Sequence, residues 1–125
     1  MKISEAISRI DTLKPNTYAT EDKLHWLSKL DGQIYEEVFK THEGNPLESF
    51  SGYSNDTDIE NTELLVAAPY DDLYPLWLET RIDYTNGEYN KYNVSITMFD
   101  TAYRSFTNYY NRTHKPLSTA KFRYF

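Results

Sequence analysis

The feature that most constrains the fold of this chain is a run of apolar and aromatic side chains between residues 70 and 112, which recur every three or four positions. Such spacing keeps one side of a helix facing a partner along its length. The run starts after Pro69, where Asp71 and Asp72 suit a first helical turn, and it stops before Pro116. The sequence therefore predicts a long amphipathic helix. Its aromatic stripe comprises Leu78, Ile82, Tyr89, Tyr92, Ile96, Phe99, Tyr103, Phe106 and Tyr110.

The pair Asn86-Gly87 lies inside this run and leaves its geometry open. Gly in a helix interior costs about 1 kcal/mol relative to Ala, and Asn-Gly is also a strong turn signal. One helix from Asp71 to Asn111 would be roughly 60 Å long, whereas a compact domain of this size has a radius of gyration of about 14 Å. Either the chain folds back at Gly87 into a hairpin, or the helix runs in line and leaves part of its stripe for other subunits. Because the stripe keeps its phase across Gly87, the in-line helix is favoured.

Two shorter helices are expected before this one. Apolar side chains recur at helical spacing over residues 3–14, with Ser4 as the expected N-cap. They recur again over residues 20–39, with Thr20 as the expected N-cap. The buried face of the second helix should comprise Leu24, Leu27, Leu30, Ile34, Val38 and Phe39.

Residues 41–62 are polar and turn-forming, and they predict a long loop. Loops of this length are uncommon in a compact domain unless they bind a partner, although an excursion over the surface without a role is the alternative. Phe50, Tyr53 and Ile59 are the side chains expected to anchor it. The predicted fold is all-α, with a helical domain over residues 1–115 and an extended tail over residues 116–125.

The distribution of charge narrows the possible partners. Residues 1–69 carry 13 acidic and 6 basic side chains, whereas residues 112–125 carry 4 basic and no acidic ones. An acidic body disfavours general nucleic-acid binding, which depends on Lys and Arg. A basic, aromatic tail suits a groove or a sheet edge on another protein, with a frayed terminus as the alternative. The tail residues expected to dock are Leu117, Lys121, Phe122, Arg123, Tyr124 and Phe125.

No catalytic, metal or cofactor site is predicted, and the chain is not expected to be an enzyme. Glu21 and His25 stand four residues apart, but no further ligands for a zinc or di-iron site are visible. Glu79 and Asp83 are also four apart and could with Asp72 hold Mg²⁺, but acidic residues on the exposed side of an amphipathic helix are the commoner explanation. Cysteine is absent, and no apolar run is long enough to span a membrane. The start of the chain lacks the pattern of an export signal, so the protein is expected where it is made.

The sequence resembles the head–tail connector (adaptor, or head-completion) proteins of tailed phages and prophages of Gram-positive bacteria. The resemblance lies in residues 70–116, together with ISRIDTLKPNTY at 7–18 and KLHWLSKLDGQIYEEVF at 23–39. Its most specific positions are Asp83, Gly87, Glu88, Tyr92, Asn93, Phe99, Tyr109, Tyr110, Arg112 and Pro116.

This resemblance implies a mostly helical virion subunit that is assembled in the host cytoplasm and forms a ring in the phage neck, beneath the portal. Its partners would be the portal protein, neighbouring copies of itself, and a tail-completion or stopper protein. DNA would only pass through the channel, without specific binding, and no membrane would be involved. Residues 116–125 would grip the portal, and the aromatic stripe would pack subunit on subunit. The alternative is a helical interaction module of another phage assembly that does not bind a portal.

Overall fold

The computed structural model describes residues 1–117, and the predicted all-α fold is confirmed for them. The helices are α1 (Ile3–Leu13), α2 (Thr20–Ile34) with a continuing π-helical turn η1 (Tyr35–Phe39), α3 (Leu73–Thr85) and α4 (Tyr89–Thr113). These residues contain no strand. Their β-type pairings are two isolated bridges, Lys2 with Glu63 and His42 with Pro116.

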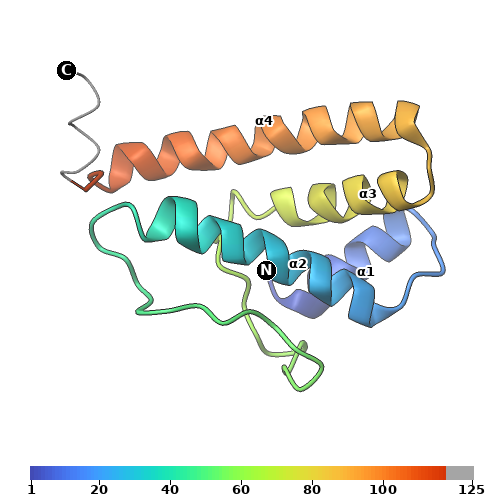
Figure 1. The fold of residues 1–125 in the computed structure, drawn as a ribbon, viewed down its shortest axis with the longest axis horizontal. Coiled ribbons are helices and arrows are strands. Elements are labelled where there is room, and N and C mark those ends of the chain that lie inside the picture. The colour runs from blue at the N-terminus through green and yellow to red at the C-terminus, as the bar shows by residue number, and fades with distance from the viewer. Residues whose placement is uncertain (118–125) are drawn as a thin grey trace.

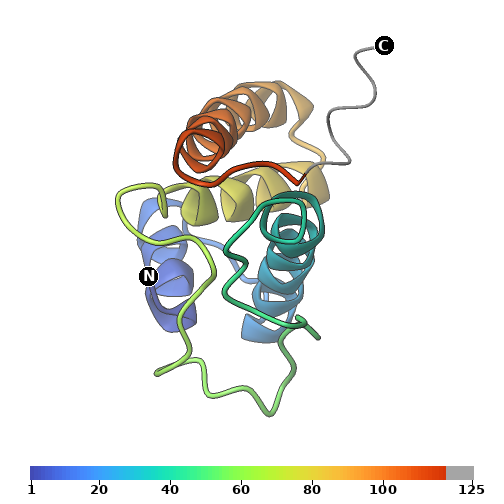
Figure 2. The same ribbon diagram turned by 90° about the vertical axis from the view of Figure 1, so that its left-hand side faces the viewer.

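Helix α3 lies at the centre of the molecule. Figures 1 and 2 show α4 packed along one side of α3, with α1 and α2 on the other side. Leu73, Tyr74, Leu78 and Ile82 of α3 are fully buried, and they do not share one face. A helix whose buried residues are spread around it is expected in such a position, because it packs against partners on more than one side.

The expectation of one in-line helix over residues 71–111 is wrong, because the chain turns back between Thr85 and Tyr89. Gly87 adopts φ +74°, and its amide donates to the carbonyl of Tyr84 (3.0 Å). The amide of Glu88 donates to the carbonyl of Asp83 (2.9 Å). These two bonds form a Schellman motif, which ends a helix on a left-handed residue. The unbroken phase of the stripe favoured one helix, but it fits a hairpin equally well, because two antiparallel helices pack through apolar faces that meet.

Helix α4 has 25 residues and α3 only 13, so α4 extends past the start of α3. Its second half packs on segments that are distant in sequence. The rings of Tyr70 and Tyr109 stack with centroids 4.6 Å apart, and those of Phe39 and Tyr110 with centroids 5.3 Å apart. The overhanging end of α4 is therefore joined to η1 and to the segment that precedes α3.

The first two helices are confirmed, but both expected caps are wrong. Ser4 lies inside α1, and the Glu5 carboxylate instead accepts a hydrogen bond from the amide of Lys2 (2.8 Å). Ala19, rather than Thr20, is the N-cap of α2. The six side chains expected on the buried face of the second helix are all buried. The error is one or two residues at each start, within the usual uncertainty of helix ends.

The predicted loop at 41–62 belongs to a longer irregular segment that runs from the end of η1 to the start of α3. Its three expected anchors, Phe50, Tyr53 and Ile59, are partly buried against the core, as predicted. The amide of Tyr53 also donates to the hydroxyl of Ser28 on α2 (2.9 Å). Although irregular, the segment is attached to the helices at several points.

We expect Gly87→Ala to lower the free energy of unfolding by about 1 kcal/mol, because a left-handed backbone strains any residue with a Cβ. Gly32→Ala in α2 is the matched control. A Cβ at either position would meet no atom within 4 Å, but Gly32 is helical, so Ala there should stabilise the protein by about 0.5–1 kcal/mol. Urea unfolding of both variants measures the two effects. A Gly87→Ala variant as stable as the parent would contradict the turn.

Candidate functional site

The structure divides the aromatic stripe into a buried part and a surface part. Five of its members are in the core: Leu78, Ile82, Phe99, Phe106 and Tyr110. These five pack within the subunit, which corrects the expectation that the whole stripe faces other subunits. Tyr89 is exposed, and Tyr92, Ile96 and Tyr103 are partly exposed, so these four alone reach the surface.

Three of the surface members line a groove between α2, α3 and α4, which we call the Arg81 groove. Its volume is about 440 Å³. Its lining comprises Leu30, Gln33, Trp77, Arg81, Tyr92, Ile96, Phe99, Asp100 and Tyr103. Concave, mostly apolar surfaces with a few polar groups are typical binding sites for other molecules or other chains.

Arg81 is held in this groove by aromatic rings. Its guanidinium carbon lies 4.5 Å from the ring centroid of Trp77, 5.4 Å from that of Tyr84 and 5.9 Å from that of Tyr92. Trp77 is itself fixed, because its indole N–H donates to the carbonyl of Trp26 (2.9 Å). Stacking of this kind stabilises a cation and limits its motion.

No carboxylate in residues 1–117 lies within ion-pair distance of Arg81. The side chain makes one long hydrogen bond, from Nε to the hydroxyl of Thr80 (3.4 Å). The two Nη groups are therefore available to a carboxylate from outside the subunit, which a guanidinium binds with two parallel hydrogen bonds.

A hydroxyl in the same groove also lacks a partner in the described structure. The Tyr103 hydroxyl is buried and makes no hydrogen bond within residues 1–117. Burial, together with the negative charge of Glu37, raises the pKa of Tyr103 to about 12. The Tyr103 phenol is therefore neutral near pH 7, and its ring lines the groove.

The base of the predicted docking tail is attached to the body. The amide of Leu117 donates to the carbonyl of Thr41 (3.0 Å), and the amide of Glu43 donates to the carbonyl of Lys115 (2.8 Å). Between them, His42 is buried, with Nε2 2.6 Å from Oδ1 of Asn111 on α4. Of the predicted tail contacts only Leu117 is described, and it is 39% exposed. Lys121, Phe122, Arg123, Tyr124 and Phe125 lie outside the described residues.

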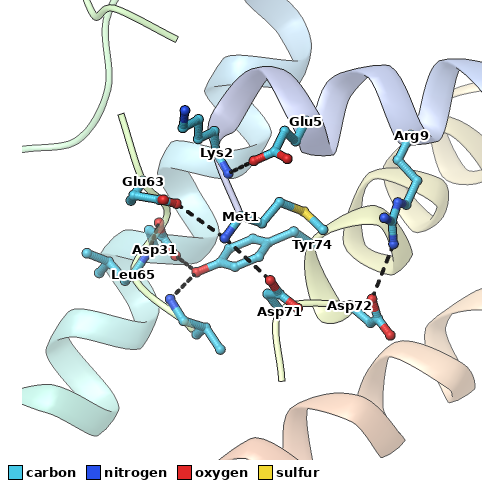
Figure 3. Close-up of polar contacts among 11 residues, drawn as sticks. Met1, Lys2, Glu5, Arg9, Asp31, Glu63, Leu65, Asp71, Asp72 and Tyr74 are labelled. Atoms are coloured by element: carbon cyan, nitrogen blue, oxygen red, sulfur yellow. Dashed lines mark hydrogen bonds and ion pairs between the residues drawn. The ribbon is translucent and has the colours of Figure 1, made fainter. Parts of the chain in front are cut away.

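A buried carboxylate on α2 holds the irregular segment against α3. Asp31 has no exposed surface, and its Oδ1 accepts from the hydroxyl of Tyr74 (2.6 Å), as Figure 3 shows. Its Oδ2 accepts from the hydroxyl of Tyr53 and from the amide of Leu65 (3.1 Å). The Tyr74 hydroxyl also accepts from the amide of Val66 (2.8 Å). Every polar atom of this network has a partner, as buried polar groups require.

A second buried carboxylate, Asp83 on α3, joins three helical elements. Its Oδ2 accepts from the hydroxyl of Ser95 on α4 (2.9 Å), and it forms an ion pair with Lys14, just after α1. Because these internal groups surround Asp83, it does not form an open metal site with Glu79. The residues described here contain no group of three or more His, Asp or Glu side chains placed to hold a metal.

Further ion pairs join the start of the chain to the segment before α3. The N-terminal amine of Met1 lies 3.3 Å from Glu63 and 3.4 Å from Asp71, and Arg9 lies 3.5 Å from Asp72 (Figure 3). Glu63, Asp71 and Asp72, like the buried Asp31 and Asp83, therefore already have partners within the subunit. The Nη groups of Arg81 in the groove have no such partner within residues 1–117.

Sequence reasoning missed the two polar residues that matter most here, although each left a signal. Arg81 follows Trp77 by four residues and precedes Tyr84 by three, which places all three on one side of a helix. Asp31 lies four residues after Leu27 and three before Ile34, so the same spacing places it on the buried face of α2.

No protein-family model matches the chain, and neither a curated protein nor a solved structure matches it. The resemblance to head–tail connector proteins therefore stays a prediction. None of the helices within residues 1–117 combines the length and the apolar character needed to cross a membrane.

We expect Tyr74→Phe to lower the free energy of unfolding by about 2–4 kcal/mol, because it leaves a buried carboxylate oxygen and the Val66 amide without partners. Tyr53→Phe is the matched control. It removes one hydrogen bond to the same carboxylate at a partly exposed site that water can enter, so it should cost about 1 kcal/mol. Denaturant unfolding measures both, and equal losses would contradict this assignment.

The stability of the protein should depend on pH through Asp31. Burial raises the pKa of Asp31 above its ordinary value of 3.8, although hydrogen bonds from Tyr53, Tyr74 and Leu65 act to lower it. The folded state therefore holds this proton more tightly than the unfolded state. It follows that the free energy of unfolding falls as pH rises from the ordinary pKa through the raised one.

Asp31→Asn removes this titration and serves as the reference. The free energy of unfolding of the parent minus that of Asp31→Asn should be greatest below the ordinary pKa and should decrease as pH rises. Urea titrations of both proteins between about pH 3 and pH 8 measure this difference. A difference that grows with pH would show that the folded pKa of Asp31 is lowered rather than raised.

Proposed function

We propose that this protein is a structural subunit of a phage neck, which assembles as an adaptor ring between portal and tail and continues the DNA channel. The sequence resemblance suggests this role. Among the structural features, the attachment of residues 115–117 to residues 41–43 supports it best. A tail that starts from a fixed point on the body can be presented to a partner in a defined direction.

Two other observations agree with this role. Part of the aromatic stripe remains on the surface in the Arg81 groove, where it can contact a neighbouring subunit. The chain is acidic overall, with a formal net charge of −6. A channel lined by such subunits would repel DNA, so that DNA slides rather than binds.

The decisive experiment removes residues 118–125 and leaves Pro116 and Leu117 in place, so that the contacts with residues 41–43 are kept. We expect the shortened protein to unfold with the same free energy as the full chain, because the described contacts are unchanged. We expect it to lose co-elution with the portal ring of its own phage, measured by light scattering across a sizing column. The full chain should co-elute as a stoichiometric ring.

A chain with residues 118–125 in shuffled order is the matched control, since it keeps the charge and composition of the tail. If the shuffled tail docks as well as the native one, charge alone directs docking. If the full chain stays apart from the portal, the neck role is overturned. The helical interaction module of another phage assembly then becomes the better description, with tail proteins as the partners to test.

A further inference from the structure

We infer that the Arg81 groove of one copy receives the acidic segment 54–60 of a second copy. This inference rests on the proposed ring, and it names the contact through which neighbouring copies meet. It is carried by opposite charges that lie on separate surfaces of the subunit and have no ion-pair partner within residues 1–117, with Asp100 as the one carboxylate that also lines the groove.

The first is the cation of the groove. Arg81 is held against Trp77, Tyr84 and Tyr92, and its Nη groups have no acceptor among residues 1–117. A guanidinium that is already fixed loses little further freedom when it binds a carboxylate. The aromatic walls also exclude water from one side, which strengthens the ion pair relative to one in bulk water.

The second is the excess of negative charge on the irregular segment. Residues 41–63 contain six acidic side chains and no Lys or Arg. Asp56 and Glu60 are exposed, and neither carboxylate takes part in an ion pair or hydrogen bond in the described structure. These two carboxylates are therefore available to a cation on another molecule.

Local hydrogen bonds give this segment a defined shape. The amide of Thr57 donates to the carbonyl of Ser54 (2.9 Å), and the amide of Thr62 donates to the carbonyl of Asp58 (2.9 Å). The Asp58 carboxylate accepts from the amide of Glu60 (3.1 Å) and from the side-chain amide of Asn61 (2.8 Å). The segment thus presents Asp56 and Glu60 from a turn that is already formed, which lowers the entropic cost of binding.

One subunit cannot bring the two surfaces together. In Figures 1 and 2 the turn at residues 54–60 lies on the side of the molecule away from α4 and from the turn that joins α3 to α4. A second copy can supply the missing partner. Because the two surfaces differ, the contact is head-to-tail, and such contacts generate rings when the rotation closes.

The basic tail is a poorer occupant for this groove. Lys121 and Arg123 would approach Arg81 with like charge. With those two cations outside the described residues and a whole-chain charge of −6, residues 1–117 carry a net charge of −8. Copies of the whole chain, each with a net charge of −6, repel one another, and a local pair of opposite charges offsets part of this repulsion.

A charge exchange tests the contact. Arg81→Glu alone, and Asp56→Lys with Glu60→Lys, should each weaken self-association by about tenfold or more, because like charges then meet. The chain that carries all three changes should recover association, since the pair is restored with opposite sign. Sedimentation velocity over a concentration series at low salt measures the effect, and circular dichroism checks the fold of each variant.

Arg104→Glu is the matched control. It makes the same change of charge on an exposed residue of α4 that does not line the groove, so it should change association little. Equal effects of Arg104→Glu and Arg81→Glu would overturn the inference, because net charge alone would then explain both. Failure of the triple variant to recover, while it remains folded, would also overturn it.

A second measurement covers the case in which the free chain does not associate at all. A synthetic peptide of residues 52–61 should bind the full chain saturably and change the fluorescence of Trp77. The same peptide carrying the neutral substitutions Asp56→Asn and Glu60→Gln should not bind. If the chain is monomeric and also does not bind the acidic peptide, the inference is overturned.

This test is separate from the test of the proposed function. The chain lacking residues 118–125 should keep the association that depends on Arg81, because the tail takes no part in that contact. If the full chain binds the portal but the charge exchange fails, only the copy-to-copy contact is wrong. If the charge exchange succeeds but portal docking fails, the neck role is wrong and the contact stands.

Discussion

The structure depends on the enclosure of α3. Its buried residues are spread around the helix rather than gathered on one face, so α1, α2 and α4 are all needed to cover it. Two of its buried polar side chains, Tyr74 and Asp83, bond to those same neighbours. Tyr74 donates to Asp31 on α2, and Asp83 accepts from Ser95 on α4 and pairs with Lys14 after α1. Each buried polar contact therefore fixes one neighbour at one position along α3.

The sequence predicted the fold class and the first two helices because amphipathic spacing survives any tertiary arrangement. It could not decide the geometry at Gly87, since a stripe in phase is equally compatible with a hairpin whose two halves face each other. The decisive information was the left-handed backbone of Gly87, which depends on tertiary packing. Local propensity alone left the two geometries nearly balanced, because Asn-Gly is a strong turn signal but is also tolerated, at a cost in stability, inside a helix.

The candidate site was less predictable than the fold. Tyr89 and Tyr110 belong to the same stripe, yet one is 60% exposed and the other 5%, because Tyr89 begins α4 beside the turn whereas Tyr110 packs on Phe39 and His42. The groove depends on Arg81 and Trp77 of α3 lying beside Tyr92 of α4, and this follows only from the turn at Gly87. Hence the error about the long helix carried over into the expectation of which aromatic side chains remain on the surface.

The tail base and the Arg81 groove are separate surfaces of the subunit, which bears on how a ring could be built. The tail base lies at the far end of α4, beside η1, whereas Arg81 lies near the turn between α3 and α4. Under the proposed function, the first would face the portal and the second a neighbouring copy. Contacts on separate surfaces that share no residue can be weakened one at a time. A subunit built in this way can therefore form its ring and dock that ring through separate interactions.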